Sequence, residues 1–199
     1  MGLTISKADL ADLPSETFGG KIVVVDNPNK VEKAIAYLAA QSVIGFDTET
    51  KPAFKSGEVN TVALMQLATE DTCFLFRLNR IGWPDTLCDL LCNPAIKKVG
   101  LSLHDDFAAL RKRTRREFEN FIDLQRFSNK FDITDNSLQR IYAILFGKRI
   151  RKSQRLSNWE TSTLSPAQQS YAALDAWACL RIYNHLVSGG FTDDALDQE

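Results

Sequence analysis

The amino-acid sequence predicts an α/β fold in which helices flank a mixed β-sheet. In the first part of the chain, β-rich runs follow one another across short polar turns, as in an antiparallel meander. Later, short apolar runs alternate with helical patterns, and parallel strands need crossover connections of this kind. We therefore expect an antiparallel meander that is extended by parallel strands.

The first half of the chain supplies most of the expected meander. Asn27-Pro28-Asn29 separates the first β-rich run from an apolar pattern at helical spacing over residues 31–38. Further along, the polar pair Glu70-Asp71 joins two β-rich runs and predicts a hairpin turn. The predicted strands are residues 21–26, 43–47, 61–69 and 73–78.

Helical patterns dominate the second half of the chain. Short buried strands are expected at residues 96–99 and 121–124. The predicted helices are residues 84–92, 104–112, 137–146 and 166–186. The last of them is the longest and is strongly apolar.

Length and composition favour a single domain over residues 1–199, with a core from about residue 21 to 187. The 199 residues are 44% hydrophobic, which can supply a full core. No stretch approaches the roughly 20 apolar residues of a membrane-spanning helix, and no secretion signal is evident, so we expect a cytoplasmic protein without a membrane partner. Nothing in the sequence indicates an obligate protein partner. The four cysteines form no CxxC pair and are expected to be buried thiols.

The net charge of −1 conceals a basic middle region. Residues 97–160 hold 15 Lys or Arg against 8 Asp or Glu, a local balance of +7. The densest runs are residues 111–116 and 148–155. Either run alone fits a solvated surface. Beside an acidic catalytic centre, they would serve as phosphate contacts.

The apolar run from Val43 ends in two carboxylates, Asp47 and Glu49. In a strand, residues i and i+2 point to the same face, so these two acids project together. Two carboxylates about 6 Å apart repel by about 3 kcal/mol at an effective dielectric constant near 20. A Mg²⁺ or Mn²⁺ ion bound between them removes this penalty. An ordinary pair of turn acids is the alternative.

A second acidic site follows Gly100, where a short strand leads into a helix. Asp105 and Asp106 lie near the start of that helix, and carboxylates are favoured there by the helix dipole. One of the two can be a simple helix cap, and the local pattern does not rank them.

The third site is Asp175, inside the long apolar helix near the end of the chain. Asp is rarely buried without a partner, and this one is surrounded by Ala, Leu and Trp. It needs a cation or a set of hydrogen bonds. Tyr171 lies four residues earlier, on the same helix face. A core tyrosine beside a structural aspartate is the alternative.

Together these segments resemble the DEDD, or DnaQ-like, 3'-5' exonucleases, in the subgroup whose last motif is Tyr-x-x-x-Asp. The likeness is greatest to the ribonuclease D and Werner-type exonuclease domains and extends from about Val23 to His185. Ser170 occupies the position that holds a histidine in the histidine subgroup, so the resemblance is to the tyrosine subgroup. The matching landmarks are Phe-Asp-Thr-Glu-Thr at 46–50, Leu-Met-Gln-Leu-Ala at 64–68, Val-Gly at 99–100 with Asp106, Phe-Ile-Asp-Leu-Gln at 121–125, Leu-Ser-Asn-Trp-Glu at 156–160, and Tyr171 to Asp175.

The resemblance implies a ribonuclease H-like sheet and two divalent cations, Mg²⁺ or Mn²⁺. It selects Asp106 over Asp105 as the second-motif ligand. Asp47, Glu49 and Asp175 would hold the ion that carries the attacking water, and Asp47, with Asp106 through a water, would hold the other. Tyr171 would orient the attacking water. The implied catalytic residues are therefore Asp47, Glu49, Asp106, Tyr171 and Asp175, and the four acids are the implied metal ligands.

The implied substrate is a single-stranded or 3'-overhanging nucleic acid, RNA or DNA. The expected nucleic-acid contacts are Lys148, Arg149, Arg151, Lys152, Arg155, Thr50 and Phe54. Leu103 could also pack on the terminal base, although core packing fits it equally well.

Two other functions remain as alternatives. A catalytically inactive nucleic-acid-binding or regulatory protein could keep this fold, but it would gain nothing from clustered negative charge beside phosphate. A ribonuclease H or transposase-like nuclease would not require the Tyr-x-x-x-Asp helix.

Overall fold

The strands of this protein form a six-stranded sheet in the order β1-β4-β3-β2-β5-β6. The structure is a computed structural model that describes residues 2–53 and 60–189. The strands are β1 (Lys21–Val25), β2 (Val43–Thr50), β3 (Val62–Ala68), β4 (Thr72–Phe76), β5 (Lys97–Gly100) and β6 (Phe121–Asp123).

The strand directions confirm the mixed sheet that the sequence predicts. β2, β3 and β4 form the antiparallel meander, in which Gly45 pairs with Ala68 and Asp47 with Gln66. β1 is parallel to β4 at one edge, whereas β5 and β6 continue in parallel from β2 at the other. The central strand β2 therefore joins the two parts of the sheet.

Helices cover both faces of this sheet. They are α1 (Lys7–Asp12), α2 (Val31–Ala39), α3 (Leu78–Ile81), α4 (Asp85–Leu91), α5 (Leu103–Leu110), α6 (Leu124–Asn129), α7 (Leu138–Phe146) and α8 (Pro166–Ser188), with a 3₁₀ turn at Pro28–Lys30. The sequence patterns do not predict the three short helices α1, α3 and α6. Within the described residues, no helix has both the length and the apolar character needed to cross a membrane.

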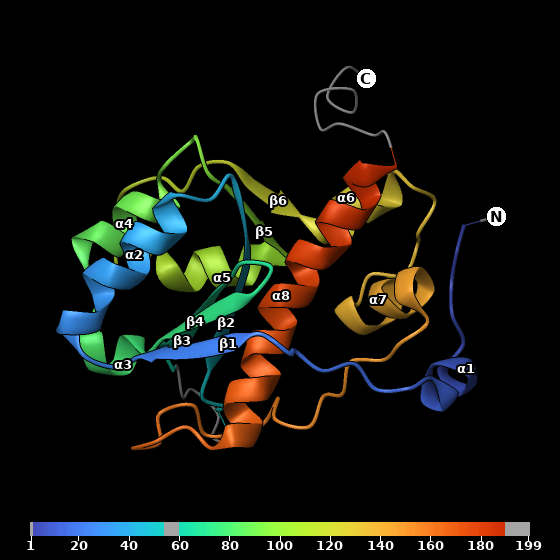
Figure 1. Cartoon of the computed structure of the whole chain (residues 1–199), viewed down its shortest axis with the longest axis horizontal. Coiled ribbons are helices and arrows are strands. Elements are labelled where there is room, and N and C mark those ends of the chain that lie inside the picture. The colour runs from blue at the N-terminus through green and yellow to red at the C-terminus, as the bar shows by residue number, and fades with distance from the viewer. Residues whose placement is uncertain (1, 54–59, 190–199) are drawn as a thin grey trace.

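α8 packs closely on one face of the sheet and lies between the α2–α4 side and the α7–α1 side of the molecule (Figure 1). Its start is well defined, because Ser165 and Gln168 form a reciprocal capping box and Pro166 occupies the first turn. A Cβ on Gly45 would lie 2.0 Å from the Ala176 carbonyl oxygen. Glycine at this position therefore lets β2 approach the helix.

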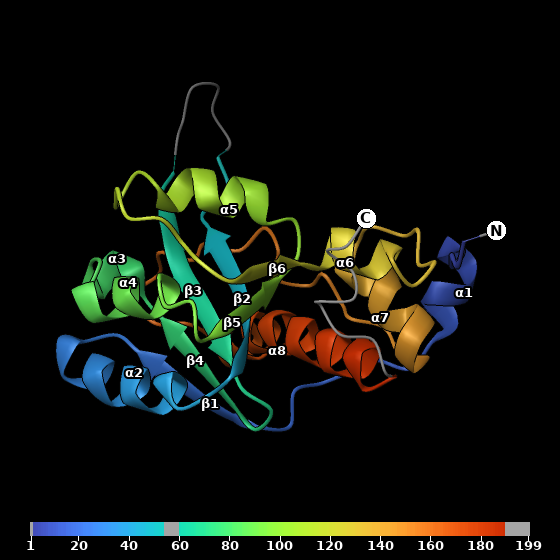
Figure 2. The same cartoon turned by 90° about the horizontal axis from the view of Figure 1, so that it is seen from above.

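The opposite face of β2 packs against a second apolar core. Phe46 is buried there, and its ring meets that of Phe121 edge-on at 5.2 Å between centroids. Phe107 of α5 packs on Phe121 at 4.9 Å. As a result, α5 and α8 lie on different sides of β2 (Figure 2).

The cysteines largely follow the expectation of buried thiols. Cys73, Cys88 and Cys179 are buried, Cys92 is half-buried, and none of the four forms a disulfide.

Candidate active site

β2 directs Asp47 and Glu49 toward α8. Gly45 faces Ala176 of α8, and the alternation of a strand places residues 47 and 49 on the same face as residue 45. The strand continues beyond its expected end at residue 47 and runs to Thr50. Both acids therefore project from regular strand rather than from a turn.

α8 brings Asp175 to the same place. One carboxylate oxygen from each of Asp47, Glu49 and Asp175 lies within 4.8 Å of the others. Asp175 is 8% exposed. The small side chains of Ala172 and Ala176, which precede and follow it on α8, are buried against the sheet. Residues 128 positions apart in the chain thus form one acidic cluster, which we call the carboxylate triad.

Asp106 joins this site from the other side of β2. Thr48 donates a hydrogen bond from Oγ1 to Asp106 Oδ1. Asp105 points away, with a side chain that is 96% exposed and hydrogen-bonded to His104. Of the two neighbouring acids, Asp106 is therefore the one that lies at the site.

Asp123 fixes the beginning of α5, which carries Asp106. Its carboxylate accepts hydrogen bonds from the backbone N–H groups of Ser102 and Leu103, each at 3.0 Å. Ser102 adopts a left-handed backbone conformation with φ of 60°. Asp123 at the end of β6 thereby ties the strand-to-helix turn to the sheet.

The electrostatics of the four acids indicate a site that favours positive charge. Burial and the charges of Asp175 and Glu49 raise the pKa of Asp47 well above its usual value. Burial, together with Asp175 and Asp106, raises the pKa of Glu49 to about 8. Burial also raises the pKa of Asp175 to about 7 and that of Asp106 to about 6. Without a cation, the four carboxyl groups resist ionising together.

Tyr171 lies one turn before Asp175 and forms a hydrogen bond with it. Burial, followed by the charges of Asp175 and Glu49, raises the pKa of the Tyr171 phenol further above its already high value. The phenol therefore remains protonated at neutral pH. Its ring packs near the buried Trp159, with the centroids 6.1 Å apart.

These groups open into a cavity of about 360 Å³. Lys152 and Arg155 stand at its rim, and their charges lower the pKa values of Asp175 and Glu49, respectively, against the effect of burial. The lining residues are Asp47, Thr48, Glu49, Leu101, Ser102, Gln125, Asn136, Ser137, Leu138, Gln139, Lys152, Arg155, Tyr171, Asp175 and Cys179. A cavity with acids at its floor and cations at its rim fits a phosphate-containing ligand held through metal ions.

The other three basic residues expected at the nucleic acid each have a protein partner. Lys148 pairs with Glu16 at 3.1 Å, and Arg151 donates to Ser15 Oγ at 2.7 Å. Arg149 donates to the Ala11 carbonyl oxygen. The N-terminal segment therefore engages these side chains, which leaves Lys152 and Arg155 facing the cavity.

The remaining expected contacts fall in different places. Thr50 pairs with Val62 at the end of β2, after a register shift. Leu103 is 4% exposed and packs in the core, the alternative that its position in the sequence allowed. Phe54 lies outside the described residues.

The sequence analysis did not identify Thr48 as a site residue. Its position between the two acids of the first motif was the available signal.

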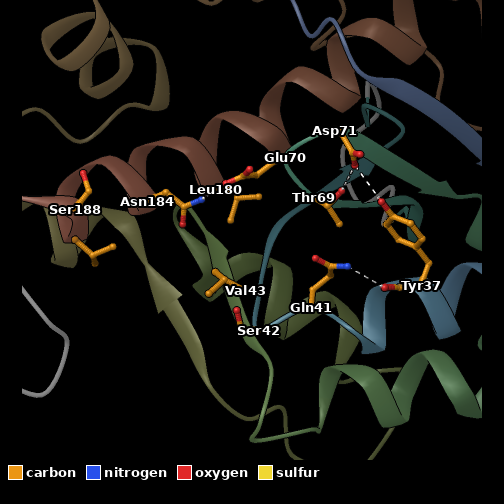
Figure 3. A pocket seen from close by; sticks show the side chains of 11 residues that line it. Tyr37, Gln41, Ser42, Val43, Thr69, Glu70, Asp71, Leu180, Asn184 and Ser188 are labelled. Carbon is orange, nitrogen blue, oxygen red and sulfur yellow. Dashed lines mark hydrogen bonds between the residues drawn. The ribbon is translucent and has the colours of Figure 1, made fainter.

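A second cavity, of about 640 Å³, lies at the opposite end of β2 and lacks comparable chemistry (Figure 3). Val43 lines it, six residues and about 20 Å along the strand from Glu49. Asp71 in this cavity accepts hydrogen bonds from Tyr37 and Thr69, both at 3.0 Å. Glu70, the other acid there, accepts a hydrogen bond from Asn184 at 3.4 Å. Both acids are thus already engaged, and we assign the functional site to the carboxylate triad.

Comparisons with known proteins point to one family for this chain. Residues 22–189 match the model of a family described as 3'-5' exonuclease. The bifunctional 3'-5' exonuclease/ATP-dependent helicase WRN of Mus musculus is 34% identical over 94% of this chain. The chain spans 14% of that protein's length.

Two solved structures share the fold. The Nibbler EXO domain of Aedes aegypti has a TM-score of 0.78 and 25% identity, with 87% of this chain and 92% of that one covered. Escherichia coli RNase D, described as an exoribonuclease involved in structured RNA processing, has a TM-score of 0.76 and 19% identity. The match covers 89% of this chain and 48% of the RNase D chain.

Proposed function

Because this chain belongs to the 3'-5' exonuclease family, we propose that it removes nucleoside 5'-monophosphates from the 3' end of a nucleic acid by metal-dependent hydrolysis. The observation that carries the proposal is the meeting of Asp47, Glu49 and Asp175 within 4.8 Å, with Asp106 held beside them by Thr48. Such a cluster is costly in a protein that does not bind cations.

The donor set fits hard divalent cations. Carboxylate oxygens are the ligands that Mg²⁺ and Mn²⁺ prefer, and the raised pKa values of Asp47 and Glu49 reflect burial together with repulsion that a cation would relieve. Asp47, Glu49 and Asp175 would hold one ion, and Asp47 with Asp106 would hold a second. When bound, two such ions lower the pKa of a water and offset charge on the leaving oxygen of a phosphodiester.

Tyr171 positions the attacking water in this proposal. Its phenol is hydrogen-bonded to Asp175 and has a raised pKa, so it is a poor base at neutral pH. A protonated phenol can still hold a water in place as donor and acceptor. We therefore assign Tyr171 to orientation of the water rather than to removal of its proton.

Lys152 and Arg155 bind the phosphates that lead to the scissile bond. They are exposed and face the cavity that holds the acids. Their charge would offset the repulsion between the nucleic-acid backbone and the acidic floor. The substrate class is therefore a single-stranded or 3'-overhanging RNA or DNA.

The direct test is cleavage of 5'-end-labelled single-stranded RNA and DNA by the purified chain with Mn²⁺. We expect a ladder that shortens from the 3' end, disappears with a chelator, and is absent for Asp47→Asn. Binding of both strands without any shortening would instead identify a catalytically inactive nucleic-acid-binding protein. Comparison of the RNA and DNA rates would define the preferred substrate.

A further inference from the structure

Gln66, in the middle of β3, carries a side-chain amide that has no partner. The residue is 0% exposed, and neither Nε2 nor Oε1 has a hydrogen bond among the described residues. Nearly all buried amides in proteins are hydrogen-bonded, because an unpaired one loses its contacts with water and gains nothing in return. A fully buried amide that lacks both bonds therefore indicates a contact that forms only when the site binds a further component.

The strand register places Gln66 directly opposite Asp47. The two residues are cross-strand partners in the antiparallel β2–β3 pair, before the register shift at Glu49 and Thr50. Such partners share a face of the sheet, with Cβ atoms about 4.5–5.5 Å apart. A glutamine side chain is long enough to span this distance and reach a carboxylate oxygen.

Apart from the two acids of β2, the neighbours of Gln66 on this face are apolar. Its partner on β4 is Leu75, and Ala68 lies two residues further along β3. The part of α8 that packs on this face contributes Ala172 and Ala176. Asp47 is therefore the polar group directly opposite the amide, whereas Glu49, which pairs with Leu64, lies diagonally from it.

We propose that Gln66 is a positioning residue for Asp47: its Nε2 donates a hydrogen bond to the Asp47 carboxylate when divalent cations are bound. This inference rests on the proposed function, since it assigns Asp47 as a ligand. A ligating carboxylate commonly uses one oxygen for the ion while a neighbouring donor fixes the orientation of the group. Gln66 supplies that donor from the interior of the sheet, where water does not compete.

The proposal predicts opposite effects of Gln66→Met on metal affinity and on stability. Methionine has a similar length and volume but no amide, so the metal-free chain loses an unsatisfied buried group. We expect its melting temperature without metal to equal or exceed that of the wild type. The same variant should bind Mn²⁺ at least about 10-fold more weakly, the usual effect of removing an outer hydrogen bond from a ligand.

The measurement is a calorimetric Mn²⁺ titration of the full chain, paired with thermal melts with and without Mn²⁺. Met65→Leu is the matched control, because Met65 is equally buried on the same strand but points to the other face. This control should keep the wild-type Mn²⁺ affinity. Wild-type Mn²⁺ affinity in Gln66→Met would overturn the proposal, whereas a wild-type chain that binds no Mn²⁺ would overturn the proposed function itself.

A second measurement needs no variant and applies if Gln66→Met does not fold. In the wild-type chain labelled with ¹⁵N-glutamine, addition of Mg²⁺ should shift the Gln66 side-chain amide protons downfield and slow their exchange with water. Gln41, which lies near the start of β2, serves as an internal reference that should not respond. Unchanged Gln66 amide signals at a Mg²⁺ concentration that stabilises the chain would contradict the proposal.

Discussion

Thr48 donates a hydrogen bond to Asp106 and thereby connects the fourth acid to the strand that carries the first two. Thr48 lies between Asp47 and Glu49, and the alternation of β2 turns it toward the opposite face of the sheet, where α5 packs. The strand therefore organises acids on both of its sides. The sequence Asp-Thr-Glu contributes three functional groups rather than two.

Replacement of Thr48 by Val should reduce activity about 10- to 100-fold, because a hydrogen bond to a charged group contributes about 1.5–3 kcal/mol. Valine keeps the branched shape, so stability should change little. The measurement is kcat and the Mn²⁺ concentration that gives half-maximal rate. Thr61→Val, the same substitution at an exposed residue, is the control. Equal rates for the two variants would exclude a role for this hydrogen bond.

The stability of the metal-free protein should fall as pH rises. Burial raises the pKa of Asp175 to about 7 and that of Asp106 to about 6, and burial with repulsion from Asp175 and Asp106 raises the pKa of Glu49 to about 8. Carboxyl groups of the unfolded chain titrate near pH 4, so the folded state binds more protons between about pH 4 and 8. The free energy of unfolding must then decrease with pH across that window.

Urea unfolding at pH 5.5, 7 and 8.5 with a chelator checks this prediction. Saturating Mg²⁺ should abolish or reverse the trend, because the ions favour the ionised acids. Asp47→Asn should weaken the pH dependence of the free energy of unfolding and should also stabilise the metal-free chain. A metal-free protein that becomes more stable toward pH 8.5 would show that the acids do not repel one another in the folded state.

Tyr171→Phe should lower kcat by about 10²- to 10³-fold, the range typical of groups that position a reactant or assist proton transfer. The effect should be smaller than that of Asp47→Asn, since the metal ligands remain. Because the phenol stays protonated at neutral pH, the variant should keep the pH dependence of the wild type. Near-normal turnover, or loss of a basic limb from the pH profile, would refute the positioning role.

Lys152 and Arg155 should account for part of the salt dependence of nucleic-acid binding. Replacing both with Gln removes two phosphate contacts, so the slope of log K against log salt for a single strand should become shallower by about 1.4. Lys148→Gln is the control in the same basic run, because Lys148 is paired with Glu16. It should leave the slope unchanged. A reduced slope in Lys148→Gln alone would place the nucleic acid elsewhere.

The sequence predicts the sheet well because periodicity and turn residues are local signals. The meander and its parallel extension appear as expected, and Asp47, Glu49 and Asp175 meet as the family resemblance implies. The local pattern does not rank Asp105 and Asp106, since both occupy the first turn of α5; the family resemblance selects Asp106, and the structure places Asp106 at the site. Which acid turns inward depends on Thr48 of another element, 58 residues earlier.

The basic run at residues 148–155 shows most clearly that a local sequence pattern does not predict long-range side-chain contacts. Lys148 and Arg151 look equivalent to Lys152 and Arg155 in sequence, yet the first two are engaged by the N-terminal segment. Their partners lie more than 130 residues away, where no periodic pattern connects them. In the sequence, Gln66 is only one residue of the Leu-Met-Gln-Leu-Ala motif. The structure shows that its side-chain amide has no hydrogen-bond partner and that the residue pairs with Asp47 across the strands.

Anomalous diffraction from crystals of the full chain soaked in Mn²⁺ tests the central claim most directly. We predict two manganese peaks about 3.5–4 Å apart, the spacing usual for two-metal sites, with oxygens of Asp47, Glu49 and Asp175 around one and of Asp47 and Asp106 around the other. Both peaks should be absent in Asp47→Asn. Manganese bound only elsewhere in the molecule, with these four acids free of metal at saturating concentration, would contradict the account.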